Sequence, residues 1–464
     1  MRWIAGLLLL GLVGAVGLYI AAGRAEPPQL TITQPGRIIG QTGAAEVTAS
    51  APNANFTALT ISVEQNGHRF PLFTLDPSQT AAANTPAGGV ITQVDRDNLK
   101  ISEPFGKQRF PELQSGAAKI IVEATRPSIL NLRQVSASAE KEFQIRLEPP
   151  KIAVLSTHHY INHGGSEMVV YRATPSDVSS GVRVGTIEYP GFPVGADPEL
   201  RLAVFALLPA QDLKAPIVAF ARDETGAEAK TTFVDQVFEK PFKKSRIELD
   251  DAFIDRVVPE IIENSPELKL TAPAPGEMIN GYLTLNGDVR KKNAGQIAAF
   301  ASKTSPTRLW NGPFIQLGNS AVEAAFADQR TYFYQGNAVD QQVHLGFDLA
   351  ATARVPVVAA NAGRVLNASW LGIYGNCVVI DHGQGVQSLY GHLSSFDVKV
   401  GDEVTKGQPI GRSGITGLAG GDHLHFTMLV GGQMVNPVEW WDPHWIADRV
   451  ERKLNESAGS TATR

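Results

Sequence analysis

Two histidines lie two positions apart in the segment GDHLHF, residues 421–426. The surrounding residues are typical of a β-strand, in which side chains at positions i and i+2 point to the same face. His423 and His425 are therefore expected to share one surface. Two imidazoles on one surface can bind a metal ion together, or one can bind the ion while the other faces its substrate. The alternative is that the two histidines lie close together by chance and have no shared function.

Other potential metal ligands gather in the same part of the chain. Five of the ten histidines fall within residues 344–425, and Asp348 follows His344 in the segment HLGFD. A catalytic zinc typically takes three His or carboxylate ligands and keeps a fourth position for water. His344, Asp348 and one histidine of the GDHLHF segment would supply such a set.

The spacing of His344 and Asp348 constrains the backbone between them. On a helix, positions i and i+4 share a face, but Gly346 and the apolar run that follows favour a turn and a strand. In a straight strand, four residues span about 13 Å, which is too far for both to bind one ion. The chain must therefore bend at Gly346 if both residues are ligands.

Three motifs in this region occur in a familiar order: HLGFD, YGHL and HLH. The segments between and after these motifs include VPVVAANAGRV, YGNCVVIDHGQG, VKVGDEVTKGQPIGRSGITG and VNPVEWW. Together these segments resemble the M23 family of LytM/lysostaphin-type zinc metallopeptidases, which cleave peptidoglycan peptides. Any one motif alone is weak, whereas the combination in this order is specific.

The resemblance implies that His344, Asp348 and His425 bind one Zn²⁺ per chain. It also implies that His392 and His423 are the catalytic histidines beside the open coordination position. Bound zinc would polarise the scissile carbonyl and lower the pKa of water, and a neutral imidazole could accept the proton of that water.

Two neighbouring positions depart from the pattern of the family. Asp422 stands where many relatives have proline, and Thr427 stands where an acidic residue is common. Neither is a ligand position. Asp422 could tune the neighbouring histidine or the rim of the substrate groove.

Other polar residues have simpler interpretations. His159 and His163 lie in HHYINHGG, residues 158–165, which we interpret as a polar loop because no acidic or Cys ligand has a matching spacing. Cys377 is the only cysteine, and its strand-like setting favours a buried structural role. His382 recurs in the family pattern without being a ligand, and we expect it to be structural.

Composition limits the function classes. The 464 residues are 43% hydrophobic and 19% charged, with a net charge of −5 and a pI near 6.1. This is ordinary globular composition with no basic excess, so we expect no nucleic-acid partner.

The N-terminus has a different composition from the rest of the chain. Residues 4–22 form an uncharged run of 19 residues, close to the length that spans a bilayer, and Arg2 precedes it. We expect a single-pass anchor in the cytoplasmic membrane with the body outside, in the periplasm of the cell envelope. A cleaved signal peptide, ending near residues 22–25, is the alternative.

The predicted fold is mainly β. Short alternating runs such as LTISVEQ, separated by turn residues, predict two Ig-like β-sandwich domains. Helical spacing over residues 245–269 predicts a linker helix with Ser245 as N-cap and a kink or break at Pro259. The C-terminal part is expected to be an antiparallel β domain of LytM type. The predicted divisions are a transmembrane helix or anchor at 1–26, β-sandwiches at 28–148 and 151–236, a helical linker at 237–310, the peptidase domain at 311–445, and a short helix with a disordered tail at 446–464.

The site by itself predicts metal-assisted amide hydrolysis. The resemblance implies an exported zinc metalloendopeptidase that hydrolyses the peptide cross-links of peptidoglycan, with the stem peptides as its substrate partner. Residues 28–236 would position the catalytic domain or cover its groove. The resemblance implies self-inhibition by these domains, and simple spacing of the catalytic domain is the alternative. The main alternative is a non-catalytic LytM-type scaffold or amidase activator, although degenerate domains of that kind lack zinc ligands that this chain retains. Cleavage of a secreted protein is a third possibility.

Overall fold

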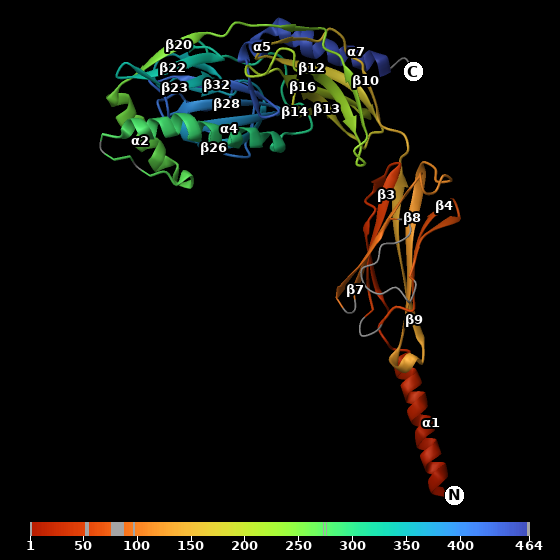
Figure 1. The fold of residues 1–464 in the computed structure, drawn as a ribbon. Coiled ribbons are helices and arrows are strands. Elements are labelled where there is room, and N and C mark those ends of the chain that lie inside the picture. The colour runs from red at the N-terminus through yellow and green to blue at the C-terminus, as the bar shows by residue number, and fades with distance from the viewer. Residues whose placement is uncertain are drawn as a thin grey trace. The chain divides into compact units, whose positions relative to one another are not determined.

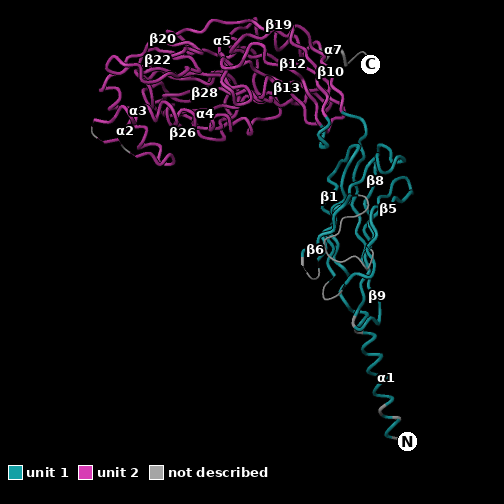
Figure 2. Tube along the Cα trace, in the orientation of Figure 1, with its two compact units in different colours: residues 1–149, 223–227 teal, residues 150–222, 228–464 magenta. Residues whose placement is uncertain are grey.

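The computed structural model describes residues 2–51, 55–75, 88–95, 98–271, 273–274 and 276–461. It is mainly β, as predicted, and divides into two compact units (Figure 2). Unit 1 comprises residues 1–149 and 223–227, and unit 2 comprises residues 150–222 and 228–464.

Unit 1 contains a sandwich of two sheets. Their strand orders are β1-β3-β7-β6 and β2-β9-β8-β4-β5, and all pairs are antiparallel except β2 with β9. Alternation of buried and partly exposed residues along β4 directs Ile61 into a core that also contains Val47 and Ile101 of the other sheet. Its elements are α1 (Arg2–Ala22), β1 (Gln29–Gln34), β2 (Ile38–Ile39), β3 (Thr42–Ser50), β4 (Ala58–Gln65), β5 (His68–Thr74), β6 (Val90–Asp95), β7 (Asn98–Gly106), β8 (Gly116–Pro127), η1 (Ile129–Asn131) and β9 (Gln134–Ile145).

The N-terminal apolar run forms helix α1 (Figure 1). Within the residues that the structure describes, no helix has both the length and the apolar character needed to cross a membrane. The membrane span predicted for residues 4–22 is therefore not supported.

The first part of unit 2 is a second pair of sheets, ordered β10-β12-β16-β15 and β14-β13-β17-β18, with a parallel pair β11-β19. β12 places Val169 and Tyr171 in a core that also contains Val182 of β13. The strands are β10 (Lys151–Val154), β11 (Tyr160–Asn162), β12 (Ser166–Thr174), β13 (Ser179–Val184), β14 (Ile187–Pro190), β15 (Phe192–Val194), β16 (Asp197–Ala206), β17 (Ile217–Arg222), β18 (Glu228–Thr232) and β19 (Gln236–Phe238).

The helix predicted over residues 245–269 is shorter than expected. Residues Lys244–Leu249 form strand β20, parallel to β22, and α2 spans Asp251–Asn264. Ser245 is therefore not the N-cap, because its hydroxyl donates to Asp328 Oδ1 from within a strand. Asp250 caps the helix by accepting from the Phe253 N–H, and α2 continues through Pro259 without dividing.

The remaining helical segments follow directly and lie against the C-terminal sheet. Asn293 on α4 accepts from the Ile373 N–H of the C-terminal part. These segments are η2 (Pro266–Leu268), α3 (Met278–Thr284), the π-turn η3 (Leu285–Val289), α4 (Arg290–Ala299) and η4 (Phe300–Lys303).

The C-terminal part is built on an eight-stranded sheet, ordered β21-β24-β32-β28-β27-β26-β30 with β33 paired to β32. Two three-stranded sheets, β20-β22-β23 and β25-β31-β29, accompany it. The strands are β21 (Ala321–Ala324), β22 (Asp328–Tyr334), β23 (Asn337–His344), β24 (Phe347–Ala350), β25 (Pro356–Val358), β26 (Gly363–Trp370), β27 (Asn376–Gly383), β28 (Val386–Leu393), β29 (Ser395–Phe396), β30 (Glu403–Val404), β31 (Pro409–Arg412), β32 (Leu424–Val430) and β33 (Gln433–Val435), with η5 at Gly372–Tyr374.

The chain ends in α5 (Pro437–Trp441), α6 (Pro443–Trp445), the π-turn η6 (Ile446–Glu451) and α7 (Arg452–Thr461). The helix α7 thus extends into the stretch expected to be a disordered tail, while residues 462–464 lie outside the described residues.

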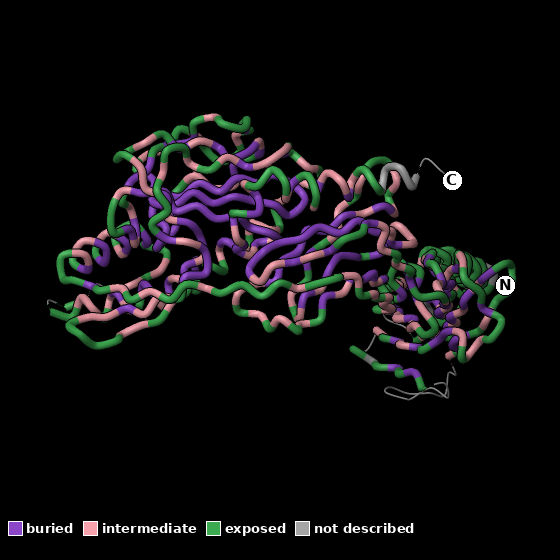
Figure 3. The backbone as a smooth tube through the Cα atoms, turned by 90° about the horizontal axis from the view of Figure 1, so that it is seen from above, coloured by how far each residue is buried: buried purple, intermediate pink, exposed green. Residues whose placement is uncertain are grey.

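The second pair of sheets and the C-terminal sheet share one core. The Glu439 carboxylate accepts from Asn162 Nδ2 and from the Ser166 N–H, both at 2.7 Å, and Trp440 Nε1 donates to Ser166 Oγ. Lys453 donates to Glu167 at 2.7 Å, and both side chains are fully buried. Buried segments accordingly run throughout unit 2 in Figure 3.

Candidate metal centre

Strands β24, β32 and β28 lie side by side and bring the predicted site residues to one place. Asp348 on β24 pairs directly with His425 on β32, which pairs on its other side with Gly391 on β28. Directly opposed residues in antiparallel strands have Cβ atoms about 4.5–5.5 Å apart. The sheet register alone therefore places the Asp348 and His425 side chains together.

His344 reaches the same point because the chain bends. It is the last residue of β23 in the three-stranded sheet, and β24 of the eight-stranded sheet begins only at Phe347. Gly346 lies in the bend, where an added Cβ would overlap the ring of His425 at Cε1 and Nε2. The bend that the His344–Asp348 spacing required is therefore present, and only glycine leaves space for the imidazole.

Three atoms converge at this point. His344 Nε2 and His425 Nδ1 each lie 3.0 Å from Asp348 Oδ1, and the two nitrogens lie 3.1 Å apart. A tetrahedral zinc with ligand bonds of about 2.0–2.1 Å separates its ligand atoms by about 3.3–3.4 Å. Two imidazole nitrogens and one carboxylate oxygen in this arrangement fit such an ion, and this is the group of potential metal ligands found among the described residues.

Hydrogen bonds and burial favour the protonation states in which the three side chains can bind a metal ion. The Nδ1 atom of His344 lies 3.2 Å from the Ala325 carbonyl oxygen, so its proton is held there and Nε2 presents a lone pair. Burial would raise the pKa of Asp348, but His344 and the hydrogen bonds from the neighbouring histidines hold that pKa well below its usual range. Burial lowers the pKa of His425 to about 4, which favours the neutral imidazole that a metal requires.

His392 and His423 lie next to the three converging atoms. Their rings are 4.9 Å apart between centroids, and His423 Nε2 lies 3.4 Å from Asp348 Oδ1. The Nδ1 atom of His392 is 2.7 Å from the Thr416 carbonyl oxygen, and that of His423 is 2.8 Å from the Gly421 carbonyl oxygen. Each ring is therefore oriented through a proton on Nδ1, and Nε2 of His423 faces Asp348 Oδ1, which raises the pKa of this imidazole despite its burial.

The backbone of His392 is strained at this position. Its φ is +63°, a left-handed conformation that non-glycine residues adopt infrequently. Such strain persists only where the surroundings enforce it, and it is concentrated at functional sites. Here, the hydrogen bond to the Thr416 carbonyl oxygen and the burial of the side chain fix the ring.

The other polar residues singled out in the sequence lie elsewhere. Both ring nitrogens of His382 are engaged, with the Ala362 carbonyl and Ser388 Oγ, each at 2.7 Å, and Cys377 is fully buried with a raised pKa. His159 lies in the connection between β10 and β11, a loop as predicted, but its ring is buried with Nε2 2.9 Å from Ser156 Oγ. None of these three contacts the candidate metal centre.

Two further residues contact this region. Asp422 accepts from Ser413 Oγ at 2.5 Å and from the Arg354 N–H at 3.0 Å, so it braces the segment before His423. Arg330 on β22 donates to Asp348 Oδ2 at 3.2 Å. No motif marked Arg330 in the sequence, because it precedes Asp348 by 18 residues on a strand of a different sheet.

Comparisons with known proteins concern this region. Residues 342–437 match the model of Peptidase family M23. The chain is 43% identical over 97 residues to DD-carboxypeptidase/endopeptidase Mpg of Neisseria meningitidis, covering 21% of this chain and 22% of the relative. It is 41% identical over 166 residues to peptidoglycan DD-endopeptidase ShyA of Vibrio cholerae, covering 35% of each. It is 43% identical over 95 residues to murein hydrolase activator EnvC of Escherichia coli, covering 20% of this chain and 23% of the relative. The chain thus spans about a third or less of the length of these relatives.

Proposed function

Because residues 342–437 form a domain of Peptidase family M23, we propose that this chain is a zinc-dependent endopeptidase that hydrolyses peptide cross-links of peptidoglycan. The observation that carries the proposal is the convergence of His344, Asp348 and His425 on one point. Two further histidines, His392 and His423, adjoin that point, and both rings are oriented by backbone carbonyls that accept from Nδ1.

Each residue has a proposed task. His344 Nε2, Asp348 Oδ1 and His425 Nδ1 would hold one zinc ion. When bound, the ion supplies Lewis acidity that polarises a carbonyl and makes water more acidic. His392 and His423 are proposed to move protons at Nε2, because the backbone carbonyls that accept from Nδ1 orient both rings.

The choice of substrate rests on the relatives. Two of them carry peptidoglycan or carboxypeptidase/endopeptidase activity in their names, and the chain shares more than two fifths of aligned positions with each. Peptidoglycan lies outside the cytoplasmic membrane. We therefore propose that the body of the protein is exported to the cell envelope and acts there on the stem peptides.

A relative that is a murein hydrolase activator makes non-catalytic action the second candidate. The potential metal ligands of this chain favour catalysis over activation. An activator needs no converging metal ligands, whereas here all three are retained together with His392 and His423.

Digestion of purified sacculi tests the proposal. We expect zinc-loaded protein to release muropeptides whose masses identify a cut peptide cross-link. His425→Ala should lose both zinc, measured by elemental analysis, and muropeptide release. His444→Ala is the matched control, because the His444 side chain is 94% exposed. Stoichiometric zinc in His425→Ala would reject the ligand assignment. If zinc-loaded wild-type protein releases no muropeptides itself but stimulates an added amidase, the second candidate function, non-catalytic activation, would be correct.

Self-inhibition by the N-terminal sandwich is a separate part of the proposal. Unit 2 has a hydrophobic core of its own, so residues 150–464 can be compared with the chain starting at residue 24. We expect faster sacculus hydrolysis without residues 28–148, since a covered groove reduces the competent population and thus the apparent activity. Equal rates at equal zinc loading would reject self-inhibition.

A further inference from the structure

Arg330 connects Asp348 to a second carboxylate. Its Nη2 donates to Asp348 Oδ2 at 3.2 Å, and its Nε donates to Asp328 Oδ2 at 3.3 Å. The Arg330 side chain is 18% exposed, and those of Asp328 and Asp348 are 3% and 13% exposed. Both contacts are therefore largely protected from water, where charge-assisted hydrogen bonds are stronger.

The two oxygens of Asp348 consequently have separate partners. Oδ1 faces His344, His423 and His425 at 3.0 to 3.4 Å. Oδ2 faces Arg330. A carboxylate whose second oxygen is held in this way offers the metal one oxygen in one orientation.

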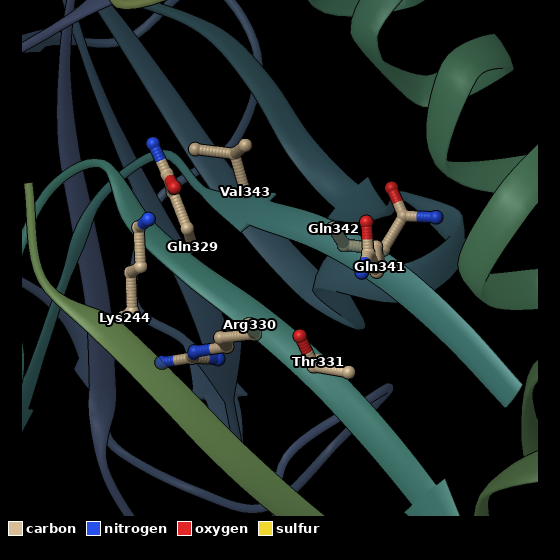
Figure 4. Close-up of a pocket in the computed structure, with 7 residues that line it drawn as sticks. All are labelled: Lys244, Gln329, Arg330, Thr331, Gln341, Gln342 and Val343. Carbon is tan, nitrogen blue, oxygen red and sulfur yellow. The ribbon is translucent and has the colours of Figure 1, made fainter. Parts of the chain in front are cut away.

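Arg330 is itself held by its surroundings. Asp328, its other partner, also accepts from Ser245 Oγ at 2.8 Å, so strand β20 contributes to fixing the guanidinium. Figure 4 shows Arg330 on β22 with Lys244 on β20 nearby, and both line a pocket of about 520 Å³. Arg330 thus extends from this pocket to the candidate metal centre.

We propose that Arg330 is a positioning residue for the metal centre: it holds Asp348 Oδ2, so that Oδ1 is the carboxylate oxygen that would bind the ion. This inference rests on the proposed zinc site and extends it to a residue that contacts neither metal nor substrate. Partners of metal-binding carboxylates typically change metal affinity or activity about 10- to 100-fold when removed.

The sign of the change in affinity distinguishes positioning from mere proximity. A cation near the site repels Zn²⁺, so Arg330→Gln would tighten zinc binding if charge were its only influence. If Arg330 positions Asp348, the same variant should bind zinc about 10- to 100-fold more weakly. The two outcomes have opposite signs.

The experiment measures the zinc dissociation constant of the full chain by competition with a chromophoric chelator, and the visible spectrum of the Co²⁺-loaded protein. Arg330→Gln leaves Asp328 buried without its cation, so the double variant D328N/R330Q is compared with it. D328N alone keeps the contact between Arg330 and Asp348 and is the matched control. Thermal unfolding followed by circular dichroism verifies that each variant is folded.

We expect weaker zinc binding and an altered cobalt spectrum in both variants that lack Arg330, with a clearly smaller change in D328N. Unchanged or tighter zinc binding in the folded double variant would overturn the inference. Neither readout uses substrate. If the wild-type protein binds zinc but cleaves no peptidoglycan, the proposed function fails while the role of Arg330 stands or falls on its own measurement.

Discussion

Replacing Glu439 by glutamine should change how the stability of unit 2 depends on pH. Glu439 is 7% exposed, and burial raises its pKa from 4.5 to about 7, even though Asn162 and Ser166 donate hydrogen bonds to the carboxylate. The native state therefore retains a proton between pH 4.5 and 7 that the unfolded chain has released. The contribution of Glu439 to stability is therefore largest below pH 4.5 and is lost as the pH rises through 7.

The size of this loss follows from the two pKa values. With 4.5 in the unfolded chain and about 7 in the folded one, the loss is about 0.8 kcal/mol at pH 5 and about 3.3 kcal/mol at pH 8. Glu439→Gln has no such term, and the Asn162 amide can rotate to pair with the new amide. The stability of wild type relative to the variant should therefore fall by about 2.5 kcal/mol between pH 5 and pH 8.

Urea unfolding followed by tryptophan fluorescence measures this difference. Five of the six tryptophans lie in unit 2, all but Trp3, and Trp440 shares the Ser166 hydroxyl with Glu439. Glu239→Gln, at an exposed carboxylate, is the matched control and should follow wild type at both pH values. A wild-type-to-variant difference that is the same at pH 5 and pH 8 would refute the reasoning.

Three further predictions follow from the site. Gly346→Ala should abolish zinc binding in folded protein, because the added Cβ would displace the ring of His425, and elemental analysis checks this. His392→Ala and His423→Ala should keep zinc but lose about 10²- to 10⁴-fold in turnover on sacculi, and near-wild-type rates in both would end their catalytic assignment. Cys377, buried with a raised pKa, should react with a thiol reagent only after unfolding, and rapid labelling of native protein would contradict its structural role.

Local residue patterns were enough to place the candidate site. The alternation in GDHLHF predicts that His423 and His425 share a face, and both rings approach Asp348 Oδ1, although His423 lies just before β32. The His344–Asp348 spacing requires a bend at Gly346, which the structure contains. These inferences succeed because strand periodicity and glycine geometry are properties of a few consecutive residues.

The boundaries between helices and strands were harder to predict from the sequence. Residues 245–249 have apolar spacing compatible with a helix, yet β20 forms there because β22, about 80 residues later, offers a strand edge for pairing. Tertiary hydrogen bonding thus overrides local helical preference. The same holds at Asp250, which becomes the N-cap only because the strand ends before it.

The sequence by itself determined the ligand types, their order along the chain and the resemblance that links them to zinc peptidases, since each is a local property of the residues. Tertiary structure alone decided that Glu439 and Lys453 join the second pair of sheets to the C-terminal sheet, and that Arg330 reaches Asp348 from another sheet. The physical reason is that hydrogen bonds and burial depend on distances in space. Residues separated by 18 to 286 positions meet only after the sheets have packed.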